Sequence, residues 1–149
     1  MASWRETADQ TAQDDVDCLL SAALPFAVRC LSAYGELYPF AAAIKEDGDQ
    51  VYLATEAMLA DQHLPATSVI AECYDALAAQ REDLRAAVVV SDVRLAGMGG
   101  DAMHFALEHS AGFALGLVQP YLLVPGRDVS LGRMSLVAGD RVTWPENAA

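Results

Sequence analysis

Three histidines and a few acidic side chains are the residues that could do chemistry in this chain. His104 and Glu108 fall on one face of a predicted strand, where they could act as acid and base or as metal ligands. Four residues along a strand span about 13 Å, too far for both side chains to bind one ion. His109 would lie on the opposite face, and His63 has no candidate ligand near it in the sequence. The spacing therefore predicts no metal site and no catalytic residue, and the side chains of His104 and Glu108 are expected to be solvated.

The cysteines and a glycine-rich segment do not form a nucleophile or phosphate site either. Cys18, Cys30 and Cys73 are predicted on apolar helix faces, where burial disfavours the reactive thiolate. No Gly-x-Ser-x-Gly motif is present in the sequence. Residues 93–101 (VRLAGMGGD) lack the Lys-Ser/Thr pair of a phosphate loop and lead into an alternating strand rather than a helix. We therefore predict no cofactor, and the sequence favours a protein that is not an enzyme.

The chain is strongly acidic. Nine Lys and Arg residues stand against 21 Asp and Glu residues, which gives a net charge of −12. Such a surface repels phosphate backbones and anionic headgroups, so nucleic acids and membranes are not expected partners. The acidic N-terminal stretch is the reverse of a basic signal-peptide start, and no run of about 20 apolar residues is present. These features predict a cytoplasmic protein.

Two segments have apolar residues spaced three and four apart, as in amphipathic helices. The first runs from Val16 to Tyr34 after a polar lead-in over residues 1–13, and Gly35 is placed to cap its end. Pro25 falls inside this segment and predicts a kink. The second helix begins at Thr67 or Ser68, and its apolar stripe consists of Val69, Cys73, Ala76, Leu77 and Leu84.

The remaining segments alternate or are continuously apolar, as strands are. Residues 38–44 and 50–55 flank Asp47-Gly48, a pair that supplies the positive φ angles of a tight hairpin turn. Residues 86–93 are apolar on both faces, which is typical of a central strand with both sides covered. The further predicted strands are residues 102–109, 113–119 and 130–137, with a short pairing segment at 141–144 and a loop at 120–128.

This order predicts a single α+β domain over residues 1–149, with an antiparallel β-sheet of about five strands and two α-helices packed on one face. The order of elements is α-β-β-α-β-β-β. Since only two helices are available, the other face of the sheet would be open. It would carry Ala106, Ala114, Gly116 and Val118, which is apolar for a solvent-facing surface and would mark an interface.

Residues 35–44 (GELYPFAAAI) and the Asp47-Gly48 turn resemble a segment of small uncharacterised bacterial α+β proteins. In these proteins a helix ends at glycine and runs into an acidic-aromatic-proline-aromatic strand. The resemblance is confined to this short segment, and it implies the local fold and no known activity. The overall order of elements is similar to the roadblock, profilin-like and secretion-chaperone folds, a similarity that carries no function.

The same segment supplies the main candidate for a contact site. Tyr38 and Phe40 would form an aromatic cluster where the helix meets the strand, with Glu36 beside them, and Asp92 interrupts the apolar strand 86–93. In one interpretation the rings pack helix against sheet, and Asp92 marks the end of the buried strand. In the other, Glu36, Tyr38, Phe40 and Asp92 surround a pocket for a ligand or partner.

Three functions follow as hypotheses. The preferred one is a non-catalytic protein-binding or accessory module that meets a protein partner or forms a homodimer. The second is a small-ligand binder or enzyme centred on Glu36, Tyr38 and Asp92. The third is an acidic inhibitor or immunity-type protein that caps a basic partner, with association that weakens as salt is added.

Overall fold

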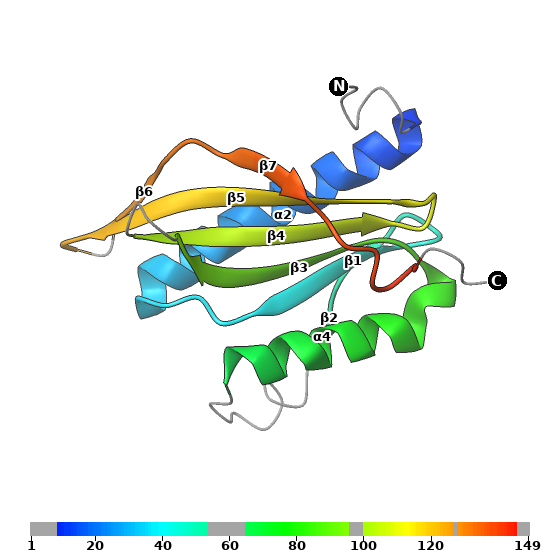
Figure 1. Ribbon diagram of the computed structural model, residues 1–149, viewed down its shortest axis with the longest axis horizontal. Helices are drawn as coiled ribbons and strands as arrows, with labels where there is room; N and C mark the ends of the chain where they lie inside the picture. The colour runs from blue at the N-terminus through cyan, green and yellow to red at the C-terminus, as the bar shows by residue number, and fades with distance from the viewer. Residues whose placement is uncertain (1–8, 54–64, 96–99, 127, 146–149) are drawn as a thin grey trace.

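The computed structural model describes residues 9–53, 65–95, 100–126 and 128–145 of the chain. In these residues the helices are α2 (Gln10–Tyr34) and α4 (Ala66–Gln80), followed by a 3-10 turn η1 (Arg81–Asp83). The strands are β1 (Phe40–Lys45), β2 (Gln50–Leu53), β3 (Leu84–Arg94), β4 (Asp101–His109), β5 (Phe113–Val124), β6 (Asp128–Leu131) and β7 (Ser135–Ala138). The helices and strands therefore form an α+β fold, as predicted (Figure 1).

The strands form one antiparallel sheet in the order β2-β1-β3-β4-β5-β6, with β7 also paired to β5. The predicted hairpin is confirmed: β1 pairs with β2, and Gly48 in the turn has a φ of 96°. The sheet has seven strands rather than about five. The outermost predicted strand, 130–137, is divided into β6 and β7, and part of the predicted loop at 120–128 lengthens β5.

The prediction that both helices lie on one face is wrong, because α2 and α4 cover opposite faces of the sheet (Figure 1). Alternate residues of β1 show this: Phe40, Ala42 and Ile44 join the core under α2, whereas Ala41 and Ala43 join the core under α4. In a strand, neighbouring side chains point to opposite faces. A strand that is apolar at every position therefore has a covering element on each side.

Helix α2 is a single element that contains Pro25 and begins earlier than predicted, at Gln10. The Asp9 side chain caps it by accepting the N–H of Ala12 at 2.8 Å, and Gly35 ends it with a φ of 73°. By length and hydropathy alone α2 could span a membrane, a test that the core helix of a soluble protein also passes. Here its apolar stripe, from Val16 to Leu31, packs on the sheet.

The face predicted to be open is covered in this structure. Helix α4 packs on β1, β2 and β3, and the chain after β7 crosses the neighbouring part of the same face toward the end of α4 (Figure 1). Gly116 is buried, and Ala106, Ala114 and Val118 are half-buried. The expected apolar patch at these four residues is therefore not exposed.

The segment at 141–144 is held by a carboxylate and not, as predicted, by strand pairing. Glu108 is buried, and its two oxygens accept the N–H groups of Thr143 at 2.9 Å and Trp144 at 2.6 Å. Arg81 donates to the carbonyl of Thr143 at 3.3 Å. Glu108 was predicted to be solvated, and its burial follows from this role.

Candidate functional site

Strands β6 and β7 form one bulged outer strand along β5. Tyr121 pairs with Leu131, and Val118 pairs with Ser135. The two pairs are three positions apart on β5 but four positions apart on the outer strand. One extra residue is therefore accommodated, as in a β-bulge. Gly132 lies in the bulge and donates its N–H to the carbonyl of Pro120 at 2.8 Å. Within the described residues, the outer side of this strand faces no further strand.

The end of β5 extends past the rest of the sheet. Strand β4 begins at Asp101, opposite Tyr121, so Leu122 to Val124 pair with β6 and with no other described strand. A two-stranded ribbon has little stability of its own in water. Apolar side chains on such a ribbon therefore gain by contact with a partner.

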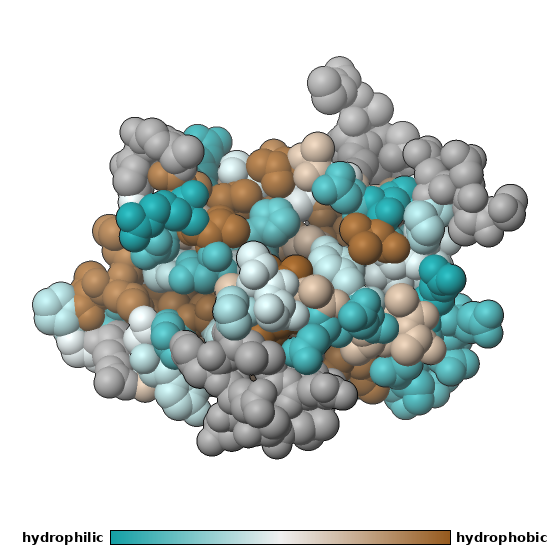
Figure 2. All heavy atoms as spheres, turned by 60° about the horizontal axis from the view of Figure 1, so that its bottom comes forward, coloured by the Kyte–Doolittle hydropathy of each residue, from teal (hydrophilic) through white to brown (hydrophobic). Residues whose placement is uncertain are grey.

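Large apolar side chains gather on this ribbon and on β7, and we call them the apolar edge. Their exposed fractions run from 38% to 64%, and the set is Leu122, Leu123, Val124, Leu131, Leu136 and Val137. In the view of Figure 2, hydrophobic atoms are visible at the end of the molecule where Figure 1 places β5 and β6. A hollow of about 560 Å³ lies beside them and is lined in part by Leu122, Leu131 and Pro120.

The apolar edge exposes residues on both faces of the sheet. Residues that are opposite each other in paired strands share a face. Leu131 is opposite Tyr121 and Leu136 is opposite Leu117, so both lie on the α2 side, as does Leu123. Leu122, Val124 and Val137 lie on the α4 side, the last opposite Gly116.

A buried charged network joins α2 to the sheet. Arg85 on β3 donates to both oxygens of Asp15 on α2 at 3.0 Å each, and His109 Nε2 lies 2.9 Å from the same carboxylate. Because the N–H of Ala111 donates to His109 Nδ1 at 3.0 Å, the ring proton is on Nε2 and points to Asp15. The hydrogen bond to Asp15 raises the pKa of Arg85, which stays charged.

This network connects α2 to the sheet, and its groups are already bonded to one another. Both nitrogens of His109 are occupied, and its ring stacks on Phe113 at 5.5 Å. The side chains of Asp15 and His109 are only 6% and 7% exposed. Asp15 is therefore buried, unlike the exposed Asp14 and Asp17 of the same helix. Its position, between Ala12 and Leu19 at helical spacing, could have shown that it faces the core.

A polar cavity of about 240 Å³ lies between α4, β4, β5 and the segment after β7. It is lined by Tyr74, His104, Glu108 and Asp140 among other residues. Burial lowers the pKa of His104, and burial together with Glu108 and Asp140 raises the pKa of Tyr74. His104 is half-buried rather than solvated as predicted. In the described part of the chain, no group of three potential ligands could hold a metal ion.

The predicted contact residues divide between two places. Glu36, Tyr38 and Phe40 line one pocket, together with residues of α2. Asp92 is not among its lining residues, and it accepts a hydrogen bond from the hydroxyl of Tyr121 on β5 at 2.8 Å. Burial raises the pKa of Asp92, and the bond from Tyr121 acts against this rise. The structure therefore brings Glu36, Tyr38 and Phe40 together where α2 leads into β1, which we call the aromatic corner, and places Asp92 elsewhere.

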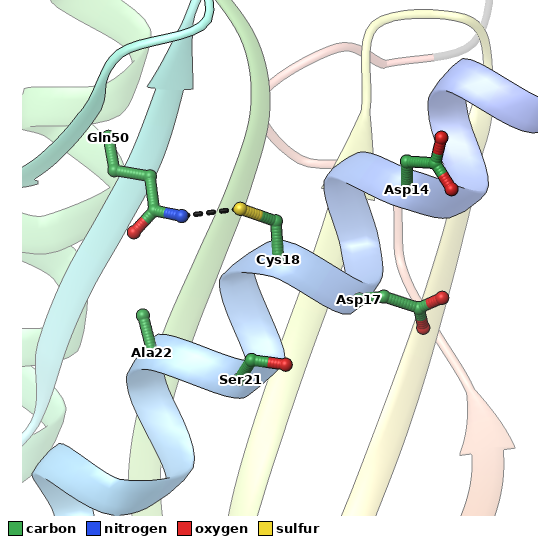
Figure 3. Close-up of a pocket in the computed structure, with 6 residues that line it drawn as sticks. All are labelled: Asp14, Asp17, Cys18, Ser21, Ala22 and Gln50. Atoms are coloured by element: carbon green, nitrogen blue, oxygen red, sulfur yellow. Dashed lines mark hydrogen bonds between the residues drawn. The ribbon is translucent and has the colours of Figure 1, made fainter.

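The cysteines are not all buried as predicted. Cys73 is buried, Cys30 is half-buried and Cys18 is exposed. Figure 3 shows Cys18 on α2 with the side-chain amide of Gln50 donating to its sulfur, in an open depression that Asp14 and Asp17 also line. This surface is too open to enclose a small ligand, so we do not assign a site to it.

No family model matches the sequence, and no curated protein and no solved structure shows significant similarity to it.

Proposed function

We propose that this protein is a non-catalytic protein-binding module that associates with a second copy of itself through the apolar edge. The observation that supports this most is the gathering of six large apolar side chains, each at least 38% exposed, on one edge of the sheet. Exposed apolar side chains that gather in one part of a surface commonly mark an interface. The proposed function is therefore the one preferred from the sequence, but the proposed interface lies on the edge of the sheet instead of on its face.

The edge location favours a partner that continues the sheet. An outer strand presents unpaired backbone groups, and natural proteins usually protect such edges with charged residues or with a covering element. Asp128 and Arg133 are the charged residues described on this outer strand, and its apolar side chains point to both faces. A second strand pairing there would bring its own side chains to both faces at once.

Charge favours a second copy as that partner. Residues 113–138 contain Arg127, Asp128 and Arg133, a net charge of +1, so the other residues together carry −13. Contact through the rest of the surface would, on balance, bring acidic residues together. A two-fold axis lets the same patch meet itself, and antiparallel pairing of two outer strands satisfies that symmetry. The apolar edge is therefore where two copies meet with least repulsion.

Sedimentation velocity over a range of protein and NaCl concentrations tests the proposal. We expect a species of twice the 15.9 kDa chain mass, in a proportion that rises with protein concentration and with added NaCl. Salt should favour the dimer because it screens the repulsion between acidic chains and leaves apolar burial intact. A single-chain mass under every condition, or a dimer that dissociates as NaCl is added, would contradict the proposal.

The salt response also separates this proposal from the acidic-inhibitor hypothesis. A complex between this chain and a basic partner would weaken as NaCl is added. The cytoplasmic location stays a prediction from the sequence.

A further inference from the structure

The aromatic corner holds a second candidate site, independent of the apolar edge. A pocket of about 160 Å³ is lined by Phe26, Cys30 and Tyr34 of α2, by Glu36 and Tyr38 of the connection, and by Phe40 of β1. Four of these six residues are aromatic. Because β1 and the β5–β6 ribbon lie on different sides of β3 and β4 in the sheet, this pocket is separate from the proposed interface.

The solvent exposure of the rings increases from the inner end of the pocket to its outer end. Phe40 is 2% exposed at the inner end, and the Phe26 ring meets it edge-on with centroids 4.8 Å apart. Tyr52 of β2 supports Phe26 from a centroid distance of 5.1 Å. Tyr34 at the outer end is 75% exposed, so its ring adds little to the packing of helix on sheet. An exposed ring beside an aromatic pocket is instead suited to contact with a ligand.

The electrostatics of the corner favour a cation. The face of an aromatic ring carries negative charge density and attracts cations within about 6 Å. The Phe26 ring already makes such a cation–π contact, because the guanidinium carbon of Arg29 lies 5.7 Å from its centroid. Glu36 adds a carboxylate among the lining residues, and the net charge of −12 raises the local concentration of small cations.

We propose that this pocket binds a small organic cation with a methylated ammonium group against the rings of Phe26 and Tyr34, with Phe40 and Tyr38 completing the lining. Glu36 supplies the opposing charge. A cluster of rings suits methylammonium better than a bare metal ion, which would need several oxygen or nitrogen ligands. At about 160 Å³ the pocket takes one such headgroup and leaves the rest of a longer ligand in solvent.

Titration of the intact protein with choline, followed by NMR of the side chains, tests this proposal against 3,3-dimethylbutan-1-ol, a neutral analogue of the same shape. Choline is expected to shift the ring resonances of the pocket and to bind about tenfold more tightly than the alcohol. Equal affinity for the two compounds would contradict the proposal, because the pocket would then bind apolar groups without regard to charge. The absence of saturable choline binding would also contradict it.

Matched variants identify the contacts. Tyr34→Leu should weaken choline binding about tenfold, whereas Tyr34→Phe should keep it, because the ring rather than the hydroxyl does the work. Glu36→Gln should weaken binding severalfold and Arg29→Met should strengthen it, since the first removes an attracting charge and the second a competing one. Glu46→Gln, in the exposed hairpin outside the pocket, is the control and should change nothing. Unchanged affinity in Tyr34→Leu would contradict the proposal.

Discussion

Replacing Asp15 by asparagine is expected to lower the free energy of unfolding by about 3 kcal/mol, the lower end of the effect of breaking a buried ion pair. The carboxylate takes two hydrogen bonds from Arg85 and one from His109 while its side chain is 6% exposed. Asparagine keeps the shape but removes the charge and turns an N–H₂ group toward one of these donors. The partly exposed Arg85, at 28%, recovers some hydration, which keeps the loss near the lower value.

Asp14→Asn is the matched control for this prediction. Asp14 precedes Asp15 in the same helix, is exposed, and accepts one surface hydrogen bond from Gln10. Its replacement should change the unfolding free energy by less than about 0.5 kcal/mol. Urea unfolding of both variants and of the parent, at one protein concentration, measures the difference. Equal effects at the two positions would show that the network does not hold α2 to the sheet.

The second large effect is expected at the apolar edge, where Leu122→Asp should weaken self-association at least about 100-fold. Leu122 is 64% exposed on the ribbon, so the change leaves the folded chain nearly undisturbed. In the dimer it removes apolar contact and places a carboxylate in each copy at an interface that excludes water. Sedimentation equilibrium measures the dissociation constant.

Tyr52→Asp serves as the control for Leu122→Asp. Tyr52 is 51% exposed on β2, at the opposite edge of the sheet. The dissociation constant should stay within about twofold of the parent value, provided that circular dichroism shows the variant to be folded. If the two substitutions weakened association equally, the dimer interface would not be the one proposed.

The α+β class and the order of elements as far as β5 could be predicted because hydrophobic spacing is a local property, whereas the division of the last strand into β6 and β7 could not. The alternating residues 102–109 were correctly predicted as a strand, which is β4, and Asp47-Gly48 correctly located the first hairpin. The placement of both helices on one face failed although the apolar run at 86–90 indicates two covered faces. The number of helices was known, but the face that each covers depends on strand pairing across the whole sheet.

Contacts between distant segments were the part that the sequence could not supply. Glu36, Tyr38 and Phe40 lie within five residues of one another, so their common pocket follows from local geometry. Asp92 comes from a distant strand, and its partner Tyr121 depends on the registers of both β3–β4 and β4–β5. The capture of Thr143 by Glu108 likewise joins residues 35 positions apart and has no local pattern.

The apolar edge was missed because residues 120–128 were assigned to a loop. Pro120 lies inside β5, paired with Ala102, and its carbonyl accepts the N–H of Gly132 from the bulge. Strand β5 therefore continues to Val124, and residues that were assigned to a loop become a ribbon with apolar side chains on both faces. The exposed apolar side chains lie on this edge and not on the sheet face where they were predicted.

Hydrogen exchange of the parent protein, compared below and above the concentration of self-association, tests the location of the interface most directly. We expect the amides of residues 128–138 to exchange more slowly at the higher concentration, while those of β2 keep one rate at both. Self-association through the apolar edge would be contradicted if exchange slowed at β2. It would also be contradicted if a dimer formed while the exchange rate of the β6–β7 strand stayed unchanged.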